Sequence, residues 1–157
     1  MSILFTPALR ALALAQGGNF TAAQGLDHGV SRKQLRTLTT RGLVEQPQPK
    51  VYRLPGAAHP FGAEWAARLQ IPASVVSHHS AGRLHGLEGT PGGVVSITVP
   101  HGHRGGASGV VIHQSRDLPP RHVMELNGLL TTRPYRTVVD LVPHVGWTRL
   151  NRLVDEV

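Results

Sequence analysis

Apolar residues near the start of the chain recur at helical spacing. Leu9, Leu12 and Ala13 stand three and four positions apart, which places them along one side of a helix. Thr6 is a suitable N-cap, and the proline that follows it suits the first turn. The pattern predicts a helix over residues 7–16, ended by a pair of glycines.

Two capping boxes come next. Thr21–Gln24 and Ser31–Gln34 each place a hydroxyl residue three positions before a glutamine, so that the two side chains satisfy each other's backbone donors. Gly29, between them, suits the left-handed end of a helix. These signals predict two short helices across a tight turn, the helix-turn-helix layout whose second helix enters the major groove of DNA. Generic helical hairpins have the same layout.

The second of these helices has a polar face without carboxylates. Leu35, Leu38 and Gly42 fall on its apolar side. The opposite side and its flanks carry Lys33, Arg36, Thr37 and Thr40, with Arg32, Gln34 and Arg41 beside them. An ordinary solvated face mixes acidic residues among the cations, but none occurs over 31–44. Cations, hydroxyls and an amide are the groups that contact phosphates and base edges, so we expect this face to bind DNA.

The pattern after this helix predicts a β-hairpin. Leu43–Val44 begin one strand, residues 50–54 alternate in polarity as a second, and two prolines bracket the turn between them. Three helices and a hairpin predict a winged helix over residues 1–56. The hairpin would be the wing, and it would carry Gln46, Gln48 and Lys50 close to the helix that enters the major groove.

Turn residues over 55–62 separate this module from a second one. There we expect helices over 63–69, 80–85 and 134–142, and a last helix from about residue 147. We also expect strands over 94–99 and 110–113, and the start of a strand or helix near 74–76. A Gly-rich segment joins the last two strands, which predicts an antiparallel pair. Thr132 is a candidate N-cap for the helix after it, in which Arg136 and Asp140 stand at i and i+4 and are expected to pair.

The predicted fold class is therefore α+β. An N-terminal winged helix-turn-helix over 1–56 precedes a small α+β domain with short antiparallel strands over 57–157.

Charge supports a binding role for the first module. The net charge is +7, and residues 1–56 hold seven cations against two anions, whereas the rest of the chain holds nine against seven. This excess favours an anionic partner such as nucleic acid. The absence of cysteine excludes disulfides, thiolate nucleophiles and cysteine-ligated metals. No apolar stretch reaches the roughly 20 residues that span a membrane, so we expect a cytoplasmic protein without a membrane partner.

Histidines and serines of the second module raise the question of a metal or catalytic site. The residues concerned are His78, His79 and His85, the pair His101 and His103, and Ser77 and Ser80 beside His79. With no cysteine, few nearby carboxylates and no Gly-x-Ser-x-Gly turn, we expect no metal, no cofactor and no catalytic residue, hence no enzyme. The basic, Gly-rich segment 101–109 leads into a strand and not into a helix, unlike a phosphate-binding loop. A flexible hairpin turn is favoured there over a second, weaker nucleic-acid contact.

Six segments stand in a distinctive order: Gly18–Thr21, Gly29–Leu35 and Val51–Gly56 in the first module, and Val76–Ala81, Ile97–Pro100 and Thr131–Leu141 in the second. In this order and spacing they resemble the AbiEi-type antitoxins of type IV toxin–antitoxin systems, over nearly the whole chain. The resemblance implies a transcriptional autorepressor whose winged helix binds double-stranded DNA at repeats in its own promoter. It also implies a second domain that supports neutralisation of a nucleotidyltransferase-type toxin.

By position, the resemblance assigns DNA contact to Ser31–Arg41. Many similar chains carry a further domain resembling a very-short-patch-repair endonuclease. That domain is expected to be absent here, because the sequence ends at Val157 within an expected helix, as a naturally short form or as a truncated one. Lys50 departs from the glycine that is common there in similar chains, and it adds a cation to the wing.

The sequence thus predicts a DNA-binding regulator with contacts from Ser31, Arg32, Lys33, Gln34, Arg36, Thr37, Thr40, Arg41, Gln48, Lys50 and Tyr52. Helix-turn-helix proteins commonly bind two half-sites as dimers, so a homodimer on DNA is one expectation. Two alternatives stay open. One is a protein-interaction adaptor that uses a winged helix, and the other is a truncated relative of an endonuclease-bearing protein.

Overall fold

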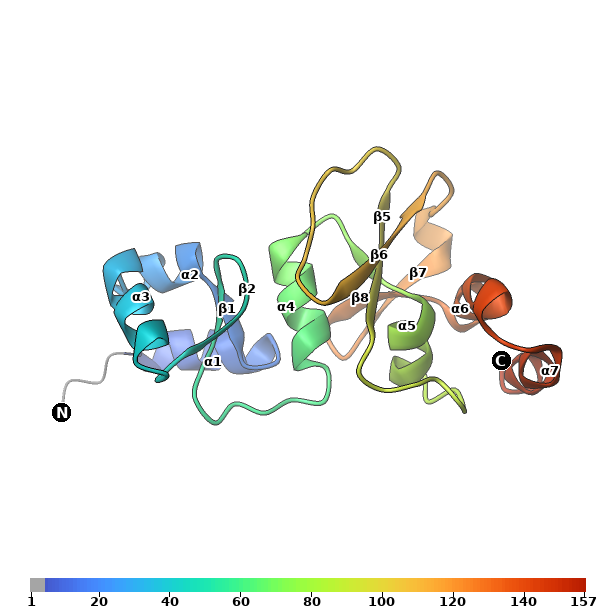
Figure 1. The fold of residues 1–157 in the computed structure, drawn as a ribbon, viewed down its shortest axis with the longest axis horizontal. Helices are drawn as coiled ribbons and strands as arrows, with labels where there is room; N and C mark the ends of the chain where they lie inside the picture. Colours follow the sequence, from blue (N-terminus) through green and yellow to red (C-terminus); the bar gives the residue numbers. More distant parts are fainter. Residues whose placement is uncertain (1–4) are drawn as a thin grey trace. The chain divides into compact units, whose positions relative to one another are not determined.

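The computed structural model describes residues 5–157, and the chain divides into two units. The first unit ends at Pro72 and the second runs from Ala73 to Val157. The described residues form seven α-helices and two β-sheets, a mixed α+β fold (Figure 1). None of these helices combines the length and the apolar composition needed to cross a membrane.

The helices of the first unit are α1 (Pro7–Ala15), α2 (Ala22–Asp27), α3 (Arg32–Thr40) and α4 (Gly62–Gln70). The predicted N-caps of the first three are confirmed. Thr6 Oγ1 accepts a hydrogen bond from the Leu9 N–H, and complete capping boxes begin at Thr21 and Ser31. Gly29 has a φ of +83°, so the turn between α2 and α3 uses a left-handed conformation that glycine adopts without steric cost. Local signals therefore produce the predicted pair of helices.

An antiparallel sheet in the order β1–β3–β2 accompanies these helices, with strands β1 (Asn19–Thr21), β2 (Glu45–Gln48) and β3 (Val51–Arg53). Phe20 is fully buried, and its ring lies 6.0 Å from the rings of Phe5 and Tyr52, measured between centroids. β2 begins later than the sequence predicts. The reason is that the Leu43 N–H still donates to the Leu38 carbonyl and closes the end of α3.

The unit boundary lies after α4, and the predicted boundary after residue 56 is wrong. α4 packs against all three strands of the first sheet. Asn19 is fully buried, and its Nδ2 donates a hydrogen bond to the Gly62 carbonyl, 43 positions away, at 2.9 Å. Gly17 has a φ of +62°, and a Cβ there would lie 2.5 Å from Cδ1 of Trp65. These long-range contacts place α4 in the first unit, whereas the turn residues before it are only a local signal.

The second unit contains a five-stranded mixed sheet in the order β6–β5–β4–β8–β7. Its strands are β4 (Val75–Val76), β5 (Val95–Pro100), β6 (Val110–Ser115), β7 (Val123–Leu126) and β8 (Leu129–Thr132). β5 and β6 pair in parallel, with Val95 opposite Val110 and Pro100 opposite Ser115, so the predicted antiparallel pairing is wrong. β4 and β8 are also parallel, while β4–β5 and β7–β8 are antiparallel.

The segment over 101–109 connects β5 to β6 and makes their parallel pairing possible. It is not the favoured hairpin turn, because it carries the chain back along the sheet to the start of β6 (Figure 1). A strand of this length advances about 20 Å, and the connecting residues reach about 30 Å when extended, so the return is feasible. Gln114 of β6 holds the segment, since its Oε1 accepts from the Gly102 N–H and its Nε2 donates to the His103 carbonyl.

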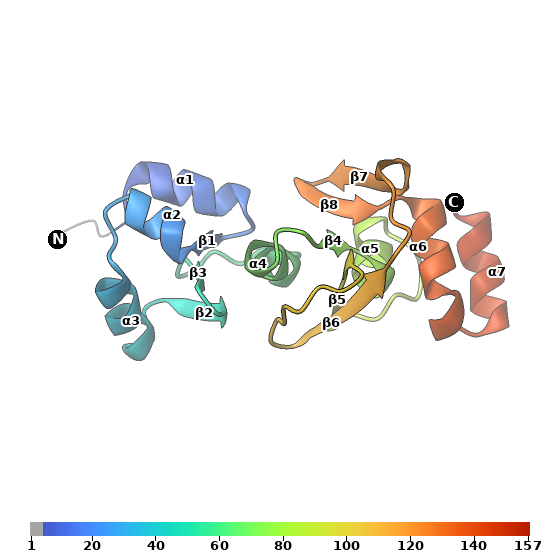
Figure 2. The same ribbon diagram turned by 90° about the horizontal axis from the view of Figure 1, so that it is seen from above.

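The helices of the second unit are α5 (His78–Leu84), α6 (Pro134–Leu141) and α7 (Trp147–Asp155). α6 packs between α5 and α7 (Figure 2). Leu141 and Leu153 are buried in the apolar cluster of α6 and α7. The N-cap of α6 is Arg133 and not the expected Thr132, whose buried hydroxyl lies 2.7 Å from Thr137 Oγ1. The Thr132 side chain is therefore part of the core and unavailable as a cap.

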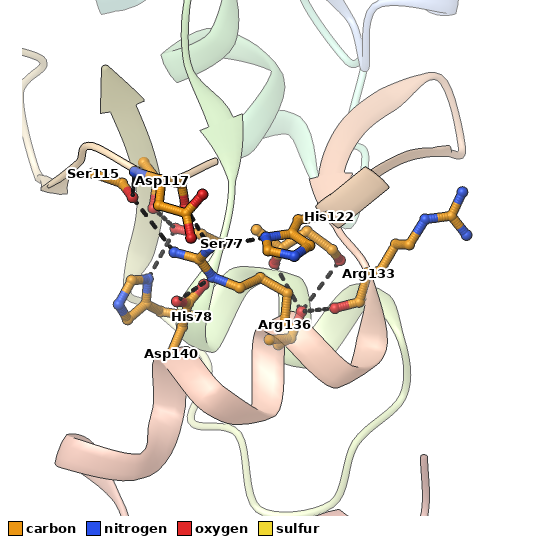
Figure 3. Close-up of polar contacts among 11 residues, drawn as sticks. Ser77, His78, Ser115, Asp117, His122, Arg133, Arg136 and Asp140 are labelled. Carbon is orange, nitrogen blue, oxygen red and sulfur yellow. Dashed lines mark hydrogen bonds and ion pairs between the residues drawn. The ribbon is translucent and has the colours of Figure 1, made fainter. Parts of the chain in front are cut away.

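Arg136 connects α6 to the segments around it (Figure 3). Its Nε lies 2.8 Å from Asp140 Oδ1, which confirms the predicted pair, and the two side chains are 16% and 10% exposed. Its Nη1 donates to the Asp117 carbonyl at 2.6 Å and lies 3.2 Å from Nδ1 of His122, and its Nη2 donates to Ser115 Oγ at 3.5 Å. A mostly buried guanidinium with this many acceptors holds several loops in place.

We expect Arg136→Ala to lower the free energy of unfolding by about 2–3 kcal/mol, because it leaves the mostly buried Asp140 carboxylate without its partner. Urea unfolding followed by circular dichroism measures the change. Arg133→Ala is the control, since the Arg133 side chain is exposed and points away from the network (Figure 3). It should change stability by less than about 0.5 kcal/mol. Equal effects of the two substitutions would contradict the role assigned to Arg136.

Candidate functional site

α3 and the β2–β3 hairpin lie side by side in the first unit (Figures 1 and 2). Between them is a groove, here called the α3–hairpin groove. Its volume is about 480 Å³. The residues that line it are Ala22, Arg32, Arg36, Thr39, Thr40, Gln46, Lys50 and Tyr52. Three of these are cations and none is acidic, so the groove suits an anionic ligand.

Burial of one side of α3 turns its polar side outward. Leu35 is fully buried and Leu38 is half-buried in the core of the first unit. The predicted contact residues on the other side are exposed, namely Arg32, Lys33, Gln34, Arg36, Thr37, Thr40 and Arg41. They do not all share one surface. Lys33, Gln34 and Thr37 line a smaller pocket of about 200 Å³ with Leu38, while Arg32, Arg36 and Thr40 line the α3–hairpin groove.

Four of the predicted contact residues also hold α3 together. Ser31 Oγ accepts from the Gln34 N–H at 3.2 Å, and Gln34 Oε1 accepts from the Ser31 N–H at 2.8 Å. Thr37 and Thr40 each donate the hydroxyl proton to a backbone carbonyl one turn earlier, at 3.0 and 2.9 Å. A ligand would therefore meet the amide protons of Gln34 and the oxygen lone pairs and methyl groups of the threonines.

Two predicted contact residues of the hairpin are buried. Gln48 is 5% exposed and Tyr52 is 9% exposed. Simple alternation places Gln46 and Gln48 on one face of the strand, but the register of β2 shifts between Glu45 and Gln48. Gln46 consequently lines the groove while Gln48 points into the interior, so Gln48 is removed from the candidate interface. Tyr52 packs on Phe20 and contributes only a small exposed part to the groove.

Lys50 occupies the hairpin turn with a φ of +62°. It precedes β3, although the sequence predicts it as the first strand residue. This left-handed conformation costs roughly 1–2 kcal/mol in a residue other than glycine, and a glycine at this position would avoid the cost. Lysine instead brings a third cation to the groove beside Arg32 and Arg36.

The list of predicted contacts omits three residues of the groove, Ala22, Thr39 and Gln46, although the sequence places Gln46 on the wing. Thr39 stands seven positions after Arg32 and three after Arg36, a spacing that places it on the same side of the helix. That signal could have identified it. Ala22 comes from α2, and no spacing within α3 indicates its position.

The acidic residues that flank α3 in sequence leave the groove cations exposed. Asp27 ends α2 and is exposed, and it does not line the groove. Glu45 pairs with Arg53 of β3 at 3.2 Å. Arg53 also donates from Nε to Asn19 Oδ1 at 3.4 Å, so this cation belongs to the fold of the unit. The positive charge of the groove is therefore not neutralised by the carboxylates nearest to it in sequence.

Two of the histidines considered as metal or catalytic candidates, His85 and His101, make polar contacts with other residues of the second unit. His85 Nε2 lies 2.7 Å from the Thr132 carbonyl oxygen, and His101 Nε2 lies 3.1 Å from Arg116 Nη2. His78 and His79 have different surroundings. They line a pocket of about 260 Å³ with two further histidines, which the sequence prediction did not include, His113 and His144.

The serines near His79 are buried and hydrogen-bonded. Ser77 Oγ accepts from Thr98 Oγ1 at 2.8 Å. Ser80 Oγ lies 3.3 Å from the carbonyl oxygen of Val94, to which it donates, and it accepts from the Ser96 N–H at 3.0 Å. Both hydroxyls therefore connect α5 with β5 and the residue before it.

Burial sets the protonation of three of these histidines. It is the largest cause that lowers the pKa of His78, to about 3, and it also lowers the pKa of His79 and of His113. Mutual repulsion within the histidine group adds to the effect. The positive charge of Arg136 also lowers the pKa of His78, and those of Arg149 and Arg83 lower the pKa of His79. The negative charge of Asp140 acts in the opposite direction and raises the pKa of His113. Because the net shifts are downward, these imidazoles are neutral near pH 7 and each keeps a nitrogen lone pair.

Comparisons with known proteins show the fold alone. No protein-family profile matches the chain, and no curated protein is significantly similar to it in sequence. The chain is similar in fold to the crystal structure of the Rv2827c protein from Mycobacterium tuberculosis, with a TM-score of 0.55 and 21% sequence identity. The match covers 94% of this chain and 71% of that one. A similarity of this kind concerns the arrangement of helices and strands and assigns no functional site.

We expect Ser31→Ala to lower the free energy of unfolding by about 1 kcal/mol, because it removes the N-cap that positions the first turn of α3. Urea unfolding measures this change. Lys33→Ala, at an exposed position two residues later, serves as the control and should alter stability by no more than about 0.5 kcal/mol. Unchanged stability in Ser31→Ala would show that the capping box does not anchor α3.

Proposed function

We propose that the first unit contains a winged helix-turn-helix and that the chain is a DNA-binding transcriptional regulator. In this proposal α2 and α3 form the helix-turn-helix, and the β2–β3 hairpin is the wing. The observation that carries the proposal is the α3–hairpin groove. Its cations Arg32, Arg36 and Lys50 are exposed, and no acidic residue lines it.

The distribution of charge favours a duplex over a small anion. Exposed cations extend beyond the groove to Lys33 and Arg41, so the positive surface continues along α3. With α3 in the major groove, Arg32 of the helix and Lys50 of the wing would hold one phosphate backbone between them. Arg36 and Thr40 would then face base edges, where arginine recognises guanine and the threonine methyl group contacts thymine.

The regulatory role that we propose is autorepression in a toxin–antitoxin pair. Its support is the resemblance of segments such as Gly29–Leu35 and Thr131–Leu141 to the AbiEi-type antitoxins. On this proposal the DNA site is a repeat in the protein's own promoter, bound by a dimer at two half-sites. The second unit would support neutralisation of a nucleotidyltransferase-type toxin.

Replacing the groove cations in Arg32→Ala/Arg36→Ala/Lys50→Gly should weaken binding to the protein's own upstream DNA. Each cation that contacts a phosphate contributes about one unit to the slope of log K against log salt, so the slope should fall by about two to three units. The glycine suits the left-handed turn and avoids a folding defect there. Fluorescence anisotropy at several salt concentrations measures both affinity and slope.

The charge-matched control is Arg121→Ala/Arg133→Ala/Arg152→Ala, at exposed positions of the second unit. It should leave the salt slope within about one unit of the wild-type value. Equal losses in both triple variants would indicate attraction by net charge alone, and unchanged binding in the groove variant would remove α3 from the interface. Wild-type protein that binds no duplex at low salt would contradict DNA binding and favour the adaptor alternative.

The toxin part of the proposal has its own test. Expression of a neighbouring gene for a nucleotidyltransferase-type protein should arrest growth, and coexpression of this chain should restore it. The groove variant should still restore growth, because neutralisation is assigned to the second unit, but it should no longer repress a reporter under the chain's own promoter. Growth that is not restored by the wild-type chain would contradict the antitoxin role while leaving DNA binding intact.

A further inference from the structure

Four histidines of the second unit gather around one pocket although they come from distant parts of the sequence. His78 and His79 begin α5, His113 lies in β6, and His144 ends the 3₁₀ helix η2 (Val142–His144). One ring nitrogen each of His78, His113 and His144 lies within 4.8 Å of the others. We propose that these three imidazoles bind a divalent transition-metal ion that prefers nitrogen ligands, such as Zn²⁺.

Three imidazoles are a sufficient set of ligands. Histidine binds Zn²⁺ at about 2.0–2.1 Å, and a site with three protein ligands keeps its fourth position for water. Imidazole also suits copper, nickel and iron, whereas Mg²⁺ and Ca²⁺ prefer oxygen ligands, of which this set has none. The ligand set therefore selects against the hard cations.

The required rearrangement is small. Tetrahedral coordination at that bond length separates the ligand nitrogens by about 3.3 Å, so the three nitrogens converge by about 1.5 Å at most. The rings of His78 and His113 are stacked, with centroids 3.5 Å apart and planes 9° apart, and this stack opens as the nitrogens converge. His144 crosses both rings edge-on at 5.5 and 5.8 Å, and its exposed position lets its ring rotate.

One nitrogen of His78 is already oriented by the fold. Its Nδ1 lies 2.9 Å from Ser77 Oγ (Figure 3). That hydroxyl oxygen in turn accepts a hydrogen bond from Thr98 Oγ1. With Nδ1 donating to this hydroxyl, Nε2 carries the lone pair and is the ligand. A hydrogen bond at the second ring nitrogen is usual for metal-bound histidine, because it fixes the tautomer and the ring orientation.

His79 provides a second observation at the same pocket. Its Nδ1 is buried and has no hydrogen-bond partner among residues 5–157. Buried polar atoms without a partner are rare in folded proteins. A water molecule in the fourth position of the metal would supply one. Pro91, Val94, Ser96 and Val111 also line the pocket.

The charges around the site act in both directions. Arg136 acts on His78, and Arg83 and Arg149 act on His79, as positive charges that disfavour a further cation. Asp140 acts on His113 in the opposite sense. Coordination by three nitrogens then provides the attraction that the surrounding charge does not.

Titration of the tag-free full chain with Zn²⁺, after treatment with a chelator, tests the proposal. Isothermal titration calorimetry should show one Zn²⁺ per chain, and His113→Ala and His144→Ala should each weaken binding at least tenfold, by analogy with the ~10–100-fold effects of lost metal-site partners. Co²⁺ in place of Zn²⁺ should give the visible absorption of a nitrogen-ligated centre, and both substitutions should abolish it.

His101→Ala is the matched control, because it removes an imidazole of the same unit outside the pocket. It should bind Zn²⁺ as the wild type does. His144 is exposed, so its replacement should leave the circular dichroism spectrum unchanged. Wild-type protein without stoichiometric binding, or equal affinity in His113→Ala, His144→Ala and His101→Ala, would overturn the site. The measurement involves no DNA, so its outcome is independent of the proposed regulatory function.

Discussion

The burial of Leu35 determines which side of α3 meets the solvent. Leu35 is fully buried in the cluster that contains Phe20 and Val30. Gly25 of α2 permits this packing, since a Cβ there would lie 3.3 Å from Cε2 of Phe20 and 3.5 Å from Cδ1 of Leu35. With Leu35 held inward, the helical repeat carries Arg36 outward. The cationic surface is therefore a consequence of how α2 and α3 pack as well as of the composition of α3.

Interactions between neighbouring residues are the part of this molecule that its sequence reveals. The Thr6 cap, the two capping boxes and the Arg136–Asp140 pair all join residues three or four positions apart, and each is present in the structure. The polar side of α3 is also predicted correctly as an exposed surface. In a nine-residue helix, the period of 3.6 residues per turn is enough to decide which residues share a face.

The errors arise where distant segments meet or where a strand is irregular. The parallel pairing of β5 with β6 depends on the whole sheet, so the glycines between the strands could not indicate it. Asn19 binds the Gly62 carbonyl across 43 positions, a contact that no local turn signal contains. The register shift in β2 reverses the side on which Gln48 lies. The histidine pocket likewise depends on tertiary structure, since three separate elements carry His78, His113 and His144.

The groove arginines of the first unit differ in role from two arginines of the second unit. In the second unit Arg83 donates from Nη1 to two backbone carbonyls at 3.0 Å, and Arg136 joins a carboxylate and two loops, so both stabilise the fold. Arg32 and Arg36 are exposed and stand at i and i+4, where like charges destabilise a helix by about 0.2–0.5 kcal/mol. Lys50 adds a further cation and a left-handed residue to the same groove. An anion bound in the groove would offset these costs to the isolated protein. The position of the charge, more than its sum, is therefore the physical reason to expect a polyanionic partner at α3.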